Sequence, residues 1–187
     1  MQKNLGKIAG VWPMPVLMIA TYDEDGTVNV MNAAWGQVCD TDKLILILDG
    51  THKTVANIRR RKAFTVALAD WRHLAEADYF GTVSGNQVPD KFAMTGLVAR
   101  KSEFVDAPVV EAFPFVMECE LAEELPSIDG FVGRIVNAAA DESVLDENGK
   151  VDPAKLGAIA FDPFRHGYYA IGEKVGSAWH DGRKFIR

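Results

Sequence analysis

The sequence has few cysteines and no long apolar stretch, and each lack excludes a class of protein. Its two cysteines, Cys39 and Cys119, lie far apart and form no CxxC pair. A zinc ribbon, an iron–sulfur centre or a dithiol redox motif is therefore disfavoured. We expect two buried thiols in a reducing compartment, and a disulfide between them stays open as the alternative.

Targeting and membrane-spanning signals are also missing. No segment reaches the roughly 18–20 apolar residues that a membrane span requires. The apolar stretch near the N-terminus is interrupted by Pro13 and Pro15, which is not typical of a signal peptide. We therefore expect a cytoplasmic protein with no membrane partner.

Positive charge is scarce as well. The formal net charge of the chain is −6 and its pI is near 5.2. General nucleic-acid binding relies on Lys and Arg to neutralise phosphates, so this function is disfavoured. The 187 residues are 48% hydrophobic and 25% charged, which indicates a single globular domain over residues 1–187. Any phosphate bound by this chain needs a local basic pocket.

Several catalytic motifs are absent. No GxGxxG follows a predicted strand, which disfavours a Rossmann dinucleotide domain. There is no GxSxG nucleophile elbow, no HExxH and no histidine pair spaced for zinc. Nucleophilic and zinc-dependent catalysis are therefore poor interpretations of this sequence.

The elements that are present are mostly short strands. An apolar run over 16–21, a turn over 23–26 and an alternating stretch over 27–30 predict a β-hairpin. Further predicted strands cover 44–48, 63–69, 115–121 and 131–139, and Gly133 in the last one indicates a bulge or a close backbone approach. Helices are expected over 51–61, with a Thr-type cap at Thr51, and over 72–80; residues 141–152 look like an exposed connection. Many short strands with few helices favour a mainly antiparallel barrel.

The start of the first predicted helix is the most suggestive cluster. His52, Lys53 and Thr54 lie where a helix exposes unpaired N–H groups, which can receive a phosphate. Asn57 lies on the same helix face as Thr54. A capped basic surface helix explains the same residues without a ligand.

Two further clusters offer ligand-binding groups. Asn32, Ala33, Ala34 and Trp35 combine small residues, which let a ligand approach the backbone, with a flat apolar ring. Ser84, Gly85 and Lys91 supply a hydroxyl, a permissive glycine and a second lysine in a loop. A core tryptophan beside a tight turn and a solvated polar loop are the respective alternatives.

The order of these pieces resembles the flavin reductase-like and flavoredoxin family of FMN-binding split barrels. The pattern runs over most of the chain, from Pro13 to Gly182, and each motif is weak alone while their shared order is specific. It is carried by the following segments: Pro13-Met14-Pro15-Val16, Asn32-Ala33-Ala34-Trp35, Lys53-Thr54, Asn57-Ile58, Ser84-Gly85, Asp90-Lys91-Phe92, Glu118-Cys119 and Tyr168-Tyr169.

The resemblance implies a six-stranded antiparallel split β-barrel with a few short helices, and a homodimer with non-covalent FMN near the dimer interface. Lys53 and Thr54 would bind the phosphate, and Asn32 to Trp35 would line the isoalloxazine ring.

The remaining residues of the implied site lie in the loop and on the helix. Ser84, Gly85 and Lys91 would hold the ribityl chain or phosphate. Asn57 and His52 complete the expected site, although the family pattern has Ser or Arg at the place of His52.

The expected function is that of an FMN-dependent oxidoreductase. Flavin carries the redox chemistry itself, so no catalytic acid–base side chain is expected. The first hypothesis is a flavin reductase that takes electrons from NADH or NADPH. A flavoredoxin-like carrier with a protein redox partner and no small-molecule substrate of its own is the alternative, and a plain flavin-binding or storage protein is a third.

Overall fold

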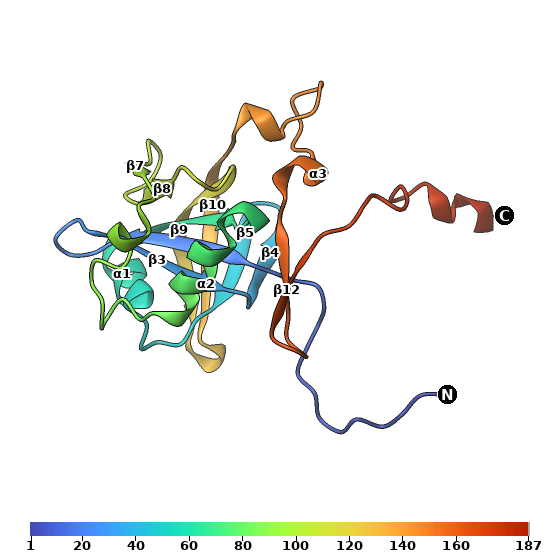
Figure 1. Ribbon diagram of the computed structural model, residues 1–187, viewed down its shortest axis with the longest axis horizontal. Coiled ribbons are helices and arrows are strands. Elements are labelled where there is room, and N and C mark those ends of the chain that lie inside the picture. The colour runs from blue at the N-terminus through green and yellow to red at the C-terminus, as the bar shows by residue number, and fades with distance from the viewer. Residues whose placement is uncertain (187) are drawn as a thin grey trace.

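A seven-stranded antiparallel sheet forms the body of the protein (Figure 1), in a computed structural model that describes residues 1–186. Its strand order is β3-β2-β6-β9-β10-β5-β4. The strands are β2 (Leu17–Tyr22), β3 (Val28–Ala33), β4 (Gly36–Asp40), β5 (Lys43–Ile47), β6 (Ala63–Leu68), β9 (Phe115–Leu125) and β10 (Gly130–Ala140).

The two edges of this sheet are consecutive in the chain. β3 ends at Ala33 and β4 begins at Gly36, although they lie at opposite ends of the strand order. The sheet must therefore curl until its edges approach each other, which makes a barrel split between β3 and β4. Gly36 marks how close the two sides come: a Cβ there would lie 2.7 Å from Leu46 of β5 and 2.8 Å from Leu17 of β2.

The predicted fold class, a mainly β antiparallel split barrel with few short helices, is confirmed. The sheet has one strand more than the six that the resemblance implies, because the chain after Trp35 continues as the short edge strand β4. Its residues after Gly36 are exposed, so they carry no alternation that could have predicted it.

Within the described residues, three α-helices and two small sheets surround the barrel. The helices are α1 (Lys53–Arg61), α2 (Leu74–Thr82) and α3 (Pro153–Leu156). A three-stranded sheet holds β1 (Met14–Pro15), β11 (Ile159–Asp162) and β12 (Gly167–Ala170), and it stands beside the barrel in Figure 1. A two-stranded sheet joins β7 (Ala99–Lys101) and β8 (Pro108–Val110). Short 3₁₀ helices are η1 (Trp71–His73), η2 (Ala93–Thr95), η3 (Pro126–Ile128), η4 (Glu142–Val144) and η5 (Asp181–Phe185).

Helix α1 packs an apolar pair into the barrel. Val55 and Ile58, three positions apart, lie fully buried in the same core cluster as Leu46 and Phe64. This confirms the helical spacing seen in the sequence.

The start of α1 differs from the expectation. The expected cap at Thr51 is wrong, because its N–H and hydroxyl both donate to Asp49 at 2.8 and 2.7 Å. The capping position falls on His52, whose side chain makes no capping hydrogen bond.

Other expectations are also refined. The second helix, predicted over 72–80, is observed as α2 and begins two residues later than predicted. It is preceded by η1, whose N-cap is the carboxylate of Asp70. The segment 141–152 is a largely exposed connection as expected, with Val144 buried.

Both cysteines are free, but only Cys119 is buried. Cys39 is exposed on the edge strand β4, so the expectation of two buried thiols is wrong.

Within residues 1–186, no helix is both long enough and apolar enough to cross a lipid bilayer.

Gly133 combines the two roles that its place in a strand indicated. The pairing of β10 with β9 shifts register between Val132 and Gly133, which is a bulge. A Cβ at Gly133 would lie 2.5 Å from the ring of Phe64, which is fully buried. The ring fills the space that the missing side chain leaves.

Gly133→Ala is expected to lower the free energy of unfolding by about 1–3 kcal/mol, because the added methyl group overpacks the core against Phe64. Urea unfolding followed by circular dichroism measures it. Gly172→Ala is the matched control, since a Cβ there meets nothing within 4 Å. Equal stability of the two variants would show that Phe64 moves aside without cost.

Candidate cofactor site

Two adjoining cavities open at the split of the barrel. The first, of about 480 Å³, is called the basic cavity; the second, of about 330 Å³, is called the aromatic cavity. Both volumes lie in the range of small-ligand and cofactor sites. The cavities share Met31, Asn32, His52, Gly81 and Thr82, so together they form one elongated site.

The basic cavity lies at the start of α1. In the described part of the chain, the backbone N–H groups of Lys53 and Thr54 have no acceptor, whereas the N–H of Val55 bonds to the carbonyl of His52 at 3.0 Å. Free N–H groups and the positive end of the helix dipole together favour an anion at this place.

A buried polar network fixes this helix start to the β2–β3 hairpin. The amide of Asn29 donates to the Thr54 hydroxyl at 2.8 Å, and the amide of Asn57 donates to Thr21 at 3.1 Å and to Asp23 at 2.6 Å. All five side chains are almost completely buried. Because each unpaired buried group would carry a large desolvation cost, this network holds the helix in one position.

Lys53 lines the basic cavity, but its ammonium is paired with a carboxylate. Its Nζ forms an ion pair with Asp23, which also accepts a hydrogen bond from Arg61 on its backbone carbonyl. The positive charge of Lys53 is therefore partly compensated within the protein. Its removal would leave Asp23, only 6% exposed, without its cationic partner.

Lys91 is the cation of the basic cavity that no carboxylate compensates. It is 2% exposed, and its Nζ donates to the carbonyls of Phe80 at 3.0 Å and Val83 at 2.7 Å. Among the described residues it forms no ion pair. Burial, reinforced by the charge of Lys53, lowers the pKa of Lys91 to about 8. A buried ammonium without a counter-charge beside a cavity is the arrangement that an anionic ligand would relieve.

The loop after α2 closes the basic cavity from the other side. Ser84 and Gly85 line it, and the amide of Asn86 donates to the carbonyl of Thr51 at 2.9 Å. Gly85 is required for this approach: a Cβ there would overlap Oδ1 of Asn29 and lie 3.1 Å from the side chain of Lys53.

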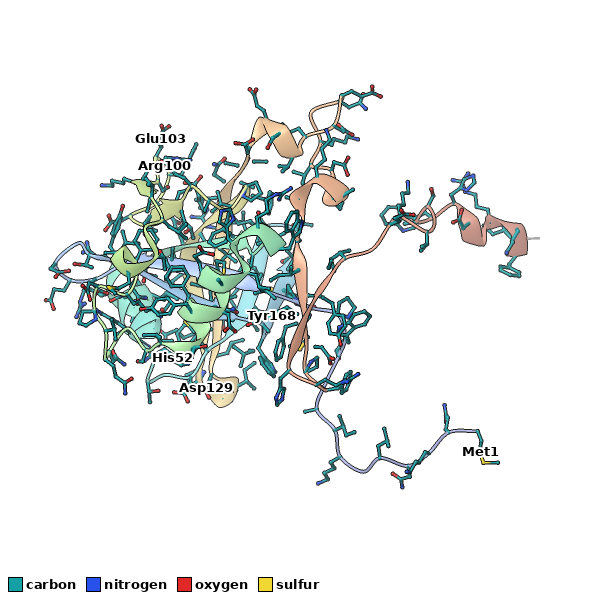
Figure 2. The ribbon with its side chains drawn as sticks, viewed as in Figure 1. Met1, His52, Arg100, Glu103, Asp129 and Tyr168 are labelled. Atoms are coloured by element: carbon teal, nitrogen blue, oxygen red, sulfur yellow. The ribbon has the colours of Figure 1, made fainter. Side chains whose placement is uncertain are left out.

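The aromatic cavity joins the barrel to the small sheet. It is bordered by Asn32 to Trp35 from the barrel edge and by Phe161 and Tyr168 from the small sheet. Figure 2 shows His52 on the barrel and Tyr168 where the small sheet meets it. The Tyr168 hydroxyl donates to Asp78 at 2.9 Å, and burial together with this contact raises the pKa of Tyr168 to about 12.

The charges of this second cavity are acidic. Asp49 and Asp78 line it together with His52, and among residues 1–186 no Lys or Arg lines it. The hydrogen bonds from the Thr51 side chain and backbone hold the pKa of Asp49 below its ordinary value. The elongated site is therefore cationic at one end and anionic at the other.

Ten of the eleven predicted site residues line one or both cavities. Asn57 does not reach either cavity, because its amide is used up in holding Thr21 and Asp23. Its proposed contribution is therefore indirect, through the position of α1. The basic cavity brings together His52, Lys53, Thr54, Ser84, Gly85 and Lys91, and the aromatic cavity holds Ala33, Ala34 and Trp35; Asn32 and His52 belong to both.

Sequence reasoning missed the residues that border the aromatic cavity from other elements. Asp49 and Asp78 gave no local signal, since a carboxylate on a short helix or in a turn is typical of a solvated surface. Phe161 lies on β11, a strand that the sequence analysis did not predict. Tyr168 belonged to the family pattern, but without a role.

A split antiparallel barrel with an anion-receptive helix start and an aromatic cavity beside it has the features of a small-molecule-binding domain. Residues 9–156 match the sequence model of a family described as "Flavin reductase like domain". The chain belongs to the flavin reductase-like family.

Solved structures are similar over nearly the whole chain. Flavoredoxin of Desulfovibrio vulgaris (Miyazaki F) is 35% identical, with a TM-score of 0.93 over 97% of this chain and 100% of that one. Flavoredoxin from Methanosarcina acetivorans, 24% identical, has a TM-score of 0.90 and full coverage of both chains. Nitrilotriacetate monooxygenase component B from Bacillus cereus, 19% identical, shares the fold with a TM-score of 0.75 over 89% of this chain and 88% of that one. A search of curated protein sequences found no match.

The lowered pKa of Lys91 predicts a pH dependence of stability. The unfolded chain protonates this lysine below its ordinary value of 10.5, whereas the folded protein protonates it only below about 8. The unfolded state therefore binds more protons between these values, and the contribution of Lys91 to stability rises with pH by at most about 1.4 kcal/mol per unit.

Urea unfolding of the ligand-free protein and of Lys91→Met at pH 7 to 10 tests this. The difference in unfolding free energy, wild type minus variant, should increase above pH 8. The raised pKa values of Cys119 and Tyr168 act in the opposite direction, but equally in both proteins, so they cancel in the difference. Parallel pH profiles would show that Lys91 titrates normally.

Proposed function

We propose that this protein binds FMN non-covalently across the two cavities and acts as an FMN-dependent oxidoreductase. The observation that carries the proposal is the buried, uncompensated ammonium of Lys91, which faces the same basic cavity as the free N–H groups of α1. In a chain with a net charge of −6, this is a local site for an anion such as a phosphate monoester.

The residues that line the two cavities fit FMN at its phosphate, at its ribityl chain and at its ring. The phosphate suits the basic cavity, with Lys91, Thr54 and the N–H groups of Lys53 and Thr54 as donors. Ser84 and Gly85 border the stretch that a ribityl chain would occupy. The flat ring suits the aromatic cavity, between Asn32–Trp35 and the rings of Phe161 and Tyr168.

When bound, the flavin supplies the electron-accepting and electron-donating ring, and the protein controls its position and access. Asn32 is held by a 2.9 Å hydrogen bond from its amide to the carbonyl of Ala77, which fixes the edge of the ring site. Trp35 is 54% exposed, so one side of the aromatic cavity stays open to a reactant. We assign no catalytic acid or base.

The finer proposal is a flavin reductase that accepts electrons from NADH or NADPH. The open aromatic cavity supports it, because nicotinamide can stack on a flavin without a separate dinucleotide domain. A carrier that exchanges electrons with a protein partner is the second candidate. It is supported by the 35% identity to a protein described as flavoredoxin over nearly the whole of both chains. We also propose that the protein is a homodimer.

FMN should bind more tightly than riboflavin, and Lys91→Met should remove most of this preference. A hydrogen bond to a charged group is worth about 1.5–3 kcal/mol, so the FMN dissociation constant should rise roughly ten- to a hundredfold while that of riboflavin is unchanged. Quenching of flavin fluorescence on binding to the apoprotein measures both constants.

Lys150→Met is the matched control, because Lys150 is exposed and lies outside both cavities. Lys53→Ala is a poorer test, since it also strips Asp23 of its partner and disturbs the fold. A Lys91→Met variant that loses FMN and riboflavin equally would contradict the proposed phosphate site.

Anaerobic mixing of the FMN-loaded protein with NADH or NADPH separates the reductase from the carrier. A reductase should lose its oxidised-flavin absorbance within seconds to minutes, and should turn over when free FMN and oxygen are added. Dithionite is the control that shows the flavin to be reducible. Reduction by dithionite alone would reject the reductase and leave the carrier.

A further inference from the structure

The aromatic cavity has a continuous wall of rings. Phe161 of β11 and Tyr168 of β12 are direct cross-strand partners, so their side chains lie on the same face of the small sheet, with ring centroids 6.0 Å apart. The ring of Trp35, at the barrel edge, lies 6.3 Å from that of Phe161, and all three residues line the cavity. The faces of aromatic rings carry partial negative charge, which attracts cations.

Two carboxylates add full negative charges to this wall. Asp78 of α2 accepts a hydrogen bond from the Tyr168 hydroxyl, and Asp49 accepts two from Thr51, which hold the pKa of Asp49 below its ordinary value. These donors are uncharged, and within residues 1–186 neither aspartate forms an ion pair. The carboxylates outnumber His52, the one basic side chain along the cavity in the described part of the chain. Rings and carboxylates therefore favour a ligand of the same sign for two separate physical reasons.

Neighbouring groups do not offset this negative charge. Asp129, which follows η3, lies at the same end of the barrel as His52 (Figure 2), and its carbonyl accepts a 2.9 Å hydrogen bond from the N–H of Leu48, which lines the cavity. Lys53 and Lys91 line the basic cavity and not the aromatic one. A phosphate monoester bound beside them carries a charge of about −1.5 to −2 and so offsets their positive charge. The surroundings of the ring site therefore stay acidic when the cofactor is present.

The opening of the aromatic cavity gives a reactant access to this charged wall, because Trp35 is about half exposed. We propose that the open side of the cavity binds flat organic cations, such as an N-alkylpyridinium ring, and rejects flat anions of the same size, such as an aromatic carboxylate. Asp49 and Asp78 are then the specificity-determining residues for the molecule that reaches the flavin. The inference rests on the FMN binding proposed above, and it adds the charge class of the reactant.

Three pyridine compounds of nearly the same size test the charge preference. At pH 8, 1-methylnicotinamide is a cation, nicotinamide is neutral and nicotinate is an anion. Each is titrated into the FMN-loaded protein while the flavin absorption spectrum is followed. The dissociation constant of nicotinate should exceed that of 1-methylnicotinamide at least about tenfold, with nicotinamide between them, and the ratio should shrink in about 0.5 M salt, which screens the carboxylates. Equal affinities, or no spectral change with any of the three, would overturn the proposal.

The variant Asp49→Asn/Asp78→Asn, in the full-length chain, tests whether the two carboxylates cause the preference. Asparagine keeps the shape of the side chain and an acceptor oxygen for Thr51 and Tyr168, so the wall should stay in place. The ratio of the nicotinate to the 1-methylnicotinamide dissociation constant should fall to about threefold or less, which is the part that the ring faces contribute. An unchanged ratio would overturn the proposal.

The matched control is Asp42→Asn/Asp141→Asn, which removes the same formal charge from two exposed aspartates outside both cavities. It should keep the wild-type ratio, and an equal fall in both variants would assign the preference to the net charge of the protein and overturn the proposed site. The spectrum of bound FMN is recorded before each titration. Failure to bind FMN therefore rejects the proposed function, whereas bound FMN without a charge preference rejects only this inference.

Discussion

The hydrogen bond from Asn29 to Thr54 is the contact on which the rest of the site depends. It joins the β2–β3 hairpin to the first turn of α1, and Asn57 and Asp23 extend it into a buried network. Because these groups have lost their water, the network is stable only when every partner is in place. It therefore fixes where the free N–H groups of α1 point, and Oδ1 of the same Asn29 determines how closely the loop at Gly85 can approach.

The two ends of the site differ in the way they handle charge. At the basic end, Asp23 partly compensates the charge of Lys53, whereas Lys91 is buried among carbonyl groups and has no carboxylate partner among the described residues. At the aromatic end, Asp49 and Asp78 line the cavity with His52 but with no Lys or Arg among the described residues. A ligand that spans both ends must place its anionic group beside Lys91 and a flat, uncharged group at the aromatic end. This polarity sets the orientation of the ligand before any contact is optimised.

Much of the fold and of the basic cavity was predictable from the sequence, because both follow from local patterns. Alternation and short apolar runs predicted the long strands, Val55 and Ile58 predicted α1, and the lysines beside small polar residues predicted an anion site. The edge strand β4 carried no alternation. The aromatic cavity is built by contacts between elements distant in the chain, such as Tyr168 with Asp78, which no local pattern encodes. Likewise, only the structure shows that a carboxylate compensates one of the two lysines.

The split of the barrel has a consequence for the order of assembly during synthesis. β3 and β4 are neighbours in sequence, yet they become the two edges of one sheet only after β9 and β10 have been inserted between β6 and β5. Lys91 is the last residue along the chain that lines the basic cavity, whereas β10 ends only at Ala140. Pairings between such distant segments form late, because loop closure must precede them. A chain emerging from the ribosome therefore carries every group of the basic cavity before the strands that close the barrel, whereas the aromatic cavity is complete only after Phe161 and Tyr168 have been made.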